Sequence, residues 1–126
     1  MLANQTIKAF VTASNPAAAK QFYGEKLGFK LLSEDSYGLE FELNYVLLRV
    51  SLVSADHGGP QKHTVLGWAV SDILETLTYL NGRGIEFERY SFLQQDDNGI
   101  WSAPGGTKVA WFKDTFGNLL SIDQKA

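Results

Sequence analysis

The chain carries the same order of predicted elements twice, and this repeat is what most limits its fold. The first predicted helix ends at Leu27-Gly28-Phe29 and the second at Arg83-Gly84-Ile85, so that the two glycines are 56 residues apart. Each copy reads as a strand, a helix and three further strands, a βαβββ unit. One copy is too small to bury a face of its own sheet, so we expect the two copies to pair.

The first copy shows clear local signals. Alternating apolar and polar residues predict a strand over residues 7–13. Asn15 is suited to cap the following helix, Pro16 fits its first position, and Gly28 supplies its end. Three more strands are predicted over residues 29–34, 38–43 and 45–53.

The second copy follows a polar, glycine-rich connector over residues 56–62. After a strand at 65–70, Asp72 and Glu75 form a D-x-x-E capping box that predicts a helix start, and further strands are predicted at 85–93, 108–113 and 119–124. We therefore expect one domain over residues 1–126, with module 1 at about 5–55 and module 2 at about 63–124.

Composition excludes several functional classes. The 126 residues include no cysteine, which removes disulfides, thiolate zinc sites and a cysteine nucleophile. The net charge of −3 with scattered basic residues argues against nucleic acid as a partner. No apolar run approaches the ~18 residues of a membrane span, and the first residues do not read as a secretory signal, so we expect no membrane partner and a cytoplasmic location.

Two motifs carry a family resemblance. The chain has Phe22-Tyr23 followed by Leu27-Gly28-Phe29 in the first copy, and Asp114-Thr115-Phe116-Gly117-Asn118 before the last strand. It resembles the vicinal oxygen chelate superfamily of glyoxalase I, bleomycin-resistance proteins and extradiol dioxygenases, although Thr115 stands where proline is usual. The resemblance implies an α+β fold of two tandem βαβββ modules, with curved mixed sheets forming a cleft, often in a homodimer.

The resemblance also locates the positions where metal-using relatives hold a divalent ion. Counted along this chain, they fall on Lys8, on Val65, on Ser121 and on one of Leu47, Arg49 and Ser51. None of these residues has a carboxylate or an imidazole, the usual protein ligands of such an ion in a chain without cysteine. Cations at Lys8 and Arg49 would also repel a metal. We therefore expect no metal and no cofactor.

The predicted ligand-binding residues follow from strand alternation on the cleft side. An arginine in the middle of an apolar strand must be paired or face a cleft, so Arg49 is either a ligand anchor or the partner of Asp123 or Glu42. Aromatic residues of module 2 are expected to line the cleft. The full predicted set is Lys8, Phe10, Thr12, Arg49, Ser51, Trp101, Trp111 and Ser121.

These residues favour a metal-independent protein that binds a planar or anionic small organic molecule. The alternative is a glyoxalase-like lyase or dioxygenase-type enzyme with a non-standard site, either binding metal through His63 and Asp123 or using Lys8 as a base. A third hypothesis is a structural domain whose cleft is filled by its own side chains, such as Phe92 and Trp101. His57 with His63 is interpreted as two solvated histidines, and Asp96-Asp97-Asn98-Gly99 as a hairpin turn.

Overall fold

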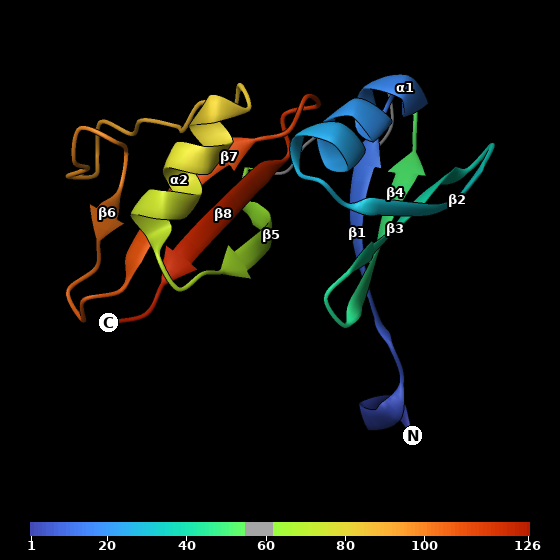
Figure 1. Cartoon of the computed structure of the whole chain (residues 1–126), viewed down its shortest axis with the longest axis horizontal. Coiled ribbons are helices and arrows are strands. Elements are labelled where there is room, and N and C mark those ends of the chain that lie inside the picture. The colour runs from blue at the N-terminus through green and yellow to red at the C-terminus, as the bar shows by residue number, and fades with distance from the viewer. Residues whose placement is uncertain (55–61) are drawn as a thin grey trace. The chain divides into compact units, whose positions relative to one another are not determined.

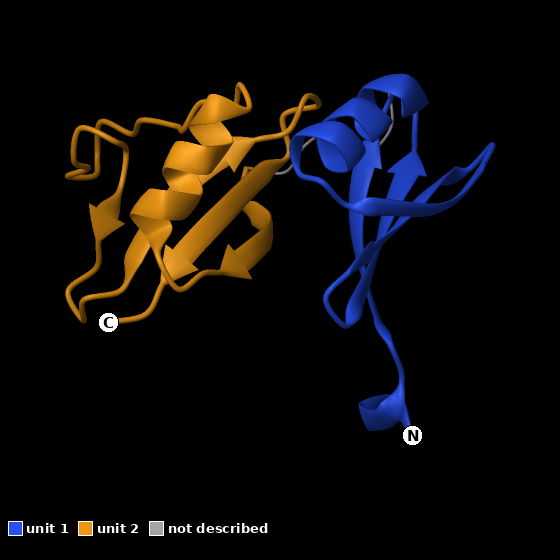
Figure 2. Cartoon of the chain, in the orientation of Figure 1, with its two compact units in different colours: residues 1–60 blue, residues 61–126 orange. Residues whose placement is uncertain are grey.

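The chain is divided into two compact units, residues 1–60 and 61–126 (Figure 2). The computed structural model describes residues 1–54 and 62–126. Residues 56–61 of the predicted connector, including His57, lie outside the described part.

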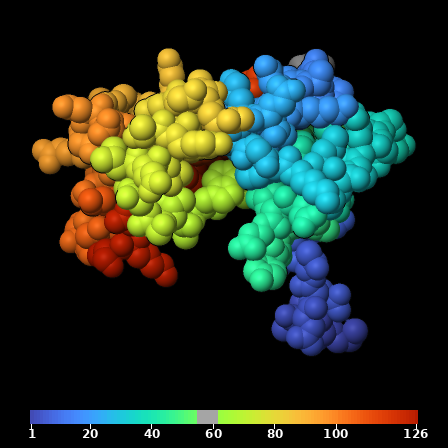
Figure 3. Space-filling model, in the orientation of Figure 1, coloured from blue at the N-terminus to red at the C-terminus, as the bar shows by residue number. Residues whose placement is uncertain are grey.

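The described part of unit 1, residues 1–54, contains one helical segment and four strands, in the order predicted for the first copy (Figure 1). A short 3-10 turn, η1 (Leu2–Asn4), precedes them, and all of its residues are exposed (Figure 3). The elements are β1 (Ile7–Ala13), α1 (Pro16–Ala19), the π-helical continuation η2 (Lys20–Lys26), β2 (Lys30–Asp35), β3 (Gly38–Leu43) and β4 (Val46–Leu52).

The helix of unit 1 begins and ends where the local signals predict. The Asn15 side chain accepts a hydrogen bond from the Ala18 N–H at 3.0 Å, and Pro16 occupies the first turn. Gly28 follows the helix with φ at +80°, a backbone conformation that glycine adopts without strain. Tyr23 is fully buried on the helix face that packs against the sheet.

The sheet of unit 1 has the strand order β1-β4-β3-β2, with β1 and β4 parallel and the other pairs antiparallel. Because side chains alternate along a strand, one face carries the core and the other remains open. The Tyr23 ring lies 6.0 Å from that of Phe41, which joins the helix to this core face. The buried sheet residues on the core face are Val11, Ala13, Leu39, Phe41, Leu48 and Val50.

Unit 2 repeats the arrangement with a longer helix and a sheet of order β5-β8-β7-β6. The β5–β8 pair is parallel and the other two pairs are antiparallel, as in unit 1. The elements are β5 (Thr64–Ala69), α2 (Ile73–Gly82), β6 (Trp101–Ser102), β7 (Lys108–Lys113) and β8 (Leu119–Gln124).

Helix α2 confirms the predicted cap and stop. The Asp72 carboxylate accepts a hydrogen bond from the Glu75 N–H at 3.0 Å, and Gly84 takes φ of +85° after the last turn. Its apolar face packs on a sheet face with buried Phe112, Leu120 and Ile122. Within residues 1–54 and 62–126, no helix is long and apolar enough to cross a membrane.

The strand predicted over residues 85–93 is wrong. This segment forms only one isolated β-bridge, between Phe87 and Phe112, and the short strand β6 pairs with the same edge of β7. The reason is a side chain: Gln95 accepts a hydrogen bond from the Tyr90 N–H at 2.7 Å and donates to the carbonyls of Glu88 and Gly99. These bonds satisfy backbone groups that a strand ladder would otherwise use.

Candidate functional site

Five of the predicted site residues lie on the open face of the unit 1 sheet. The register of β1 and β4 places Phe10 opposite Arg49 and Thr12 opposite Ser51. Lys8 precedes Phe10 by two residues and therefore points to the same face. The structure thus brings this group together on two neighbouring strands.

Arg49 is the most enclosed cation on this face, since its side chain is 20% exposed. Its Nη2 lies 3.3 Å from Oδ1 of Asp35, at the end of β2. Within unit 1, Arg49 thus pairs with Asp35, and the sequence-based pairing with Glu42 is wrong. The guanidinium reaches Asp35 by lying over Gly38, where a Cβ would be only 3.0 Å from the Arg49 Cζ and Nε atoms.

Asp35 holds the other side of this ion pair through the turn between β2 and β3. Its Oδ1 accepts hydrogen bonds from the N–H groups of Tyr37, at 2.8 Å, and Gly38, at 3.0 Å. The Tyr37 hydrogen bond and, to a smaller extent, the charge of Arg49 lower the pKa of Asp35 below its ordinary value. The carboxylate is therefore ionised at neutral pH.

The donors of Arg49 are mostly unused by the protein. A guanidinium has five N–H donors, and within the described residues the only hydrogen bond of the Arg49 side chain is the one to Asp35. Lys8 is half-exposed, and its Nζ lies 3.6 Å from the Glu40 carboxylate. The charges of Lys8 and Arg49 are balanced by those of Glu40 and Asp35. This face is therefore suited to an anionic group because of the unfilled N–H donors of Arg49, not because of a net positive charge.

The other three predicted residues lie on the open face of the unit 2 sheet. Trp111 lies opposite Ser121 in the β7–β8 register, and Trp101 lies opposite Val109 in the β6–β7 register. The ring centroids of Trp101 and Trp111 are 6.1 Å apart. Phe92 is 80% exposed, which contradicts the hypothesis that it fills a cleft from inside.

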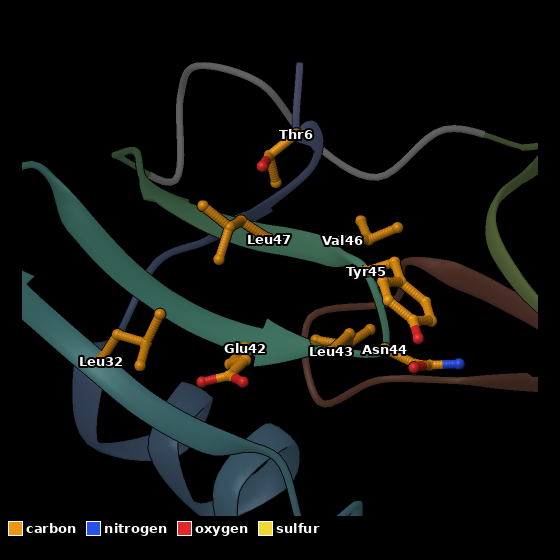
Figure 4. Close-up of a pocket in the computed structure, with 8 residues that line it drawn as sticks. All are labelled: Thr6, Leu32, Glu42, Leu43, Asn44, Tyr45, Val46 and Leu47. Carbon is orange, nitrogen blue, oxygen red and sulfur yellow. The ribbon is translucent and has the colours of Figure 1, made fainter. Parts of the chain in front are cut away.

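A separate hollow of about 440 Å³ lies near the turn between β3 and β4. Figure 4 shows Leu32, Glu42 and Leu47 lining it from β2, β3 and β4. Its rim includes Tyr45, which is 89% exposed and has φ of +63°. None of the predicted ligand-binding residues lines this hollow.

Sequence reasoning missed Asp35, Gly38 and Glu40 as members of the Arg49 cluster. The Asp35-Ser36-Tyr37-Gly38 segment does carry a turn signal, an aspartate followed three residues later by glycine. That signal predicts the turn but gives no indication that the same carboxylate binds an arginine two strands away.

The chain matches the family model of the Glyoxalase/Bleomycin resistance protein/Dioxygenase superfamily over residues 6–122. It belongs to this superfamily.

Solved structures of superfamily proteins share the fold. A glyoxalase family protein from Enterococcus faecalis is 28% identical, with a TM-score of 0.74 over 98% of this chain and 99% of that one. A superfamily member from Sphaerobacter thermophilus has a TM-score of 0.75 at 19% identity, covering 99% and 100%. Lactoylglutathione lyase from Agrobacterium tumefaciens has a TM-score of 0.71 at 15% identity, covering 96% and 93%. No curated protein sequence matches the chain.

The register gives Arg49 and Ser121 corresponding places in the two sheets. The fourth residue of β1, Phe10, lies opposite Arg49, and the fourth residue of β5, Gly67, lies opposite Ser121. Among the β4 residues, Arg49 is thus the one that corresponds to Ser121 of β8, rather than Leu47 or Ser51. Within the part of the chain that the structure describes, no three His, Cys, Asp or Glu side chains gather as a metal site.

The alternative metal pair of His63 and Asp123 is wrong. In the parallel β5–β8 pair, Thr64 lies opposite Leu119 while Ala69 lies opposite Asp123. His63 therefore precedes one end of this strand pair and Asp123 lies at the other, about 17 Å apart at the rise of a β-strand. One ion cannot bind both side chains over that distance.

Proposed function

We propose that the chain is a metal-independent small-molecule binding protein, which holds a planar organic anion on the open face of the unit 1 sheet. The observation that carries the proposal is the Arg49 guanidinium, fixed over Gly38 by Asp35 with most of its donors unfilled. A guanidinium held in one orientation is a specific partner for a carboxylate, because it can donate two parallel hydrogen bonds.

The surroundings of Arg49 support a flat ligand. Phe10, the register partner of Arg49 on β1, is 61% exposed and offers an aromatic ring on the same face. Thr12 and Ser51 lie opposite each other on the next row and carry hydroxyl groups on the same face. A planar carboxylate can therefore contact Phe10 with its ring while its anionic group binds Arg49.

Metal independence is supported by the residues at the superfamily's metal positions. Lys8 and Arg49 are cations, and Val65 and Ser121 are neither carboxylate nor imidazole. A divalent ion near a unit positive charge at ~4 Å is disfavoured by roughly 8 kcal/mol at an effective dielectric of about 20. Two of the four positions thus repel the ion that other members bind there, and the other two offer it no carboxylate or imidazole.

The anion site is tested with 2-naphthoate as the probe, titrated calorimetrically into the purified protein. We expect binding that Arg49→Gln weakens by about tenfold or more, since a charge-assisted bidentate contact is lost. Arg83→Gln is the matched control, because Arg83 is exposed in unit 2 over the Tyr79 ring. Equal affinity of wild type and Arg49→Gln, or no binding to wild type, contradicts the proposal.

Metal independence needs its own measurement. The protein is dialysed separately against zinc, nickel, manganese and iron salts, and bound metal is determined by elemental analysis. We expect no stoichiometric metal and unchanged 2-naphthoate affinity after chelator treatment. One tightly bound ion per chain would overturn this part of the proposal.

A further inference from the structure

Four aromatic rings form a continuous strip on unit 2, which we call the aromatic strip: Tyr90, Phe92, Trp101 and Trp111. Trp111 is its centre, since its ring lies 6.1 Å from Trp101 and 5.8 Å, edge-on, from Tyr90. Tyr90 in turn lies 5.4 Å from Phe92. The rings therefore make one connected aromatic surface.

The aromatic strip is only partly covered by the rest of the chain. Trp101, Trp111 and Tyr90 are half-buried, and Phe92 is largely exposed. Aromatic side chains are normally removed from water where packing allows it, and a patch of such rings rimmed by polar groups is typical of a binding surface.

The segment that carries Tyr90 is held in place before any ligand arrives. The Gln95 amide binds the N–H of Tyr90 and the carbonyls of Glu88 and Gly99. The Arg89 guanidinium donates to the backbone carbonyls of Asp96 and Asp97, which closes the same loop from its other side. Tyr90 thus belongs to a braced loop, and bracing lowers the entropy cost of binding.

The charge beside the aromatic strip is negative. Asp123 lies opposite Val109, which itself lies opposite Trp101 on the same open face. Within residues 1–54 and 62–126 its carboxylate has no salt bridge and no hydrogen bond. Lys113, a cation on β7, is paired with Glu88 at 3.4 Å. Unit 2 as a whole has eight acidic and six basic residues.

We propose that the aromatic strip and Asp123 form a binding site for a planar organic cation. The faces of tryptophan rings attract cations through their quadrupole, and tryptophan does so more strongly than tyrosine or phenylalanine. A flat cation stacks on Trp101 and Trp111 while Asp123 neutralises its charge. This site is independent of Arg49 and of the proposed function, because all its residues belong to unit 2.

The test uses 1-methylquinolinium as the cation and 2-naphthoate as the anion of similar shape. All three tryptophans of the chain lie in unit 2, and each gives one indole N–H signal by nitrogen-15 NMR. We expect 1-methylquinolinium to shift the signals of Trp101 and Trp111. The Trp68 signal is the internal control, because Trp68 stacks on Phe112, 6.2 Å away and on the core face.

Two variants separate the ring from the charge. We expect Trp111→Leu to weaken 1-methylquinolinium binding by about tenfold or more, and Asp123→Asn, which keeps the shape of the side chain, by about threefold to tenfold. Trp68→Phe and Arg49→Gln are controls that should leave the affinity unchanged. Arg49→Gln also keeps the two proposals distinct, since it should weaken the binding of 2-naphthoate and leave that of 1-methylquinolinium unchanged.

Three results overturn the cation site. These are no shift of the Trp101 and Trp111 signals at millimolar 1-methylquinolinium, equal shifts of these signals by 2-naphthoate, or an Asp123→Asn variant with wild-type affinity. Loss of binding in Trp111→Leu counts in favour only if the variant keeps the wild-type far-ultraviolet circular dichroism and Asp123→Asn also binds more weakly.

Discussion

Gly38 determines where the Arg49 guanidinium can lie. The glycine faces Ser51 in the β3–β4 register, and a Cβ built on it would stand 2.6 Å from the Val50 carbonyl oxygen as well as 3.0 Å from the guanidinium. The arginine therefore crosses the sheet through the one position on its path that has no side chain. Asp35, at the far side, is reached only because that path is open.

We expect Gly38→Ala to destabilise the protein by about 1–3 kcal/mol, since the new methyl group meets backbone that cannot move easily. Urea unfolding followed by circular dichroism measures this, and the same variant should bind 2-naphthoate more weakly. Gly105→Ala is the matched control, because a Cβ there meets nothing within 4 Å. Equal stabilities of the two variants would contradict the close contact at Gly38.

Asp35 links the stability of unit 1 to acid pH. The pKa of Asp35 is lowered in the folded state, mainly by the Tyr37 hydrogen bond and then by Arg49. The ionised carboxylate therefore stabilises the folded state at pH values above its ordinary pKa of 3.8. That contribution is lost as the pH falls through the lowered pKa. At neutral pH, we expect the wild type to have a higher melting temperature than Asp35→Asn. The difference between the two melting temperatures should disappear as the pH falls through the lowered pKa of Asp35. Thermal melts across pH test this, with Asp97→Asn as an exposed control.

Single residues also show what sequence can and cannot predict about the site. Alternation placed Phe10, Thr12, Arg49 and Ser51 on one face, because the period of a strand is a local property. The partner of Arg49 was not predictable in the same way. Asp35 is 14 residues away and two strands across, and its selection depends on how β2 and β3 are paired.

At the scale of elements, Gln95 takes the place of a strand ladder. Both helix starts and both helix ends were predictable, because each depends on residues within one turn. The structure confirms the caps at Asn15 and Asp72 and the ends at Gly28 and Gly84. The segment 85–93 has the apolar pattern of a strand, yet its backbone is bound by a side chain from the following loop. Such a tertiary contact leaves no periodic signal in the sequence.

We expect Gln95→Ala to cost about 2–3 kcal/mol of stability, because three hydrogen bonds at roughly 1 kcal/mol each are lost. Hydrogen exchange at the Tyr90 N–H should rise in the same variant. Gln94→Ala is the neighbouring control, since Gln94 is exposed. A Gln95→Ala protein with wild-type stability would mean that the loop is held by its other contacts.

At the scale of the whole molecule, the repeated βαβββ order yields two sheets with the same pairing pattern. Each has a parallel pair at its first strand, followed by antiparallel neighbours. The repeat was readable because both helices end at a glycine with the same spacing to the next segment. The open faces have nevertheless diverged, with ion pairs in unit 1 and aromatic rings in unit 2.

The resemblance to homodimeric relatives gives a prediction at this scale. We expect native mass spectrometry of the purified protein to show twice the 14.0 kDa mass of one chain. Measurement at several protein concentrations separates a specific dimer from chance association. A monomer at all concentrations would contradict the prediction.

The placement of every tryptophan in unit 2 has a practical consequence for biophysics. Unit 1 absorbs and emits in the near ultraviolet only through tyrosine and phenylalanine, so selectively excited indole emission is a natural optical label for residues 61–126 alone. Comparing that emission with the circular dichroism of the full chain during denaturation reveals whether the two halves melt together or one before the other.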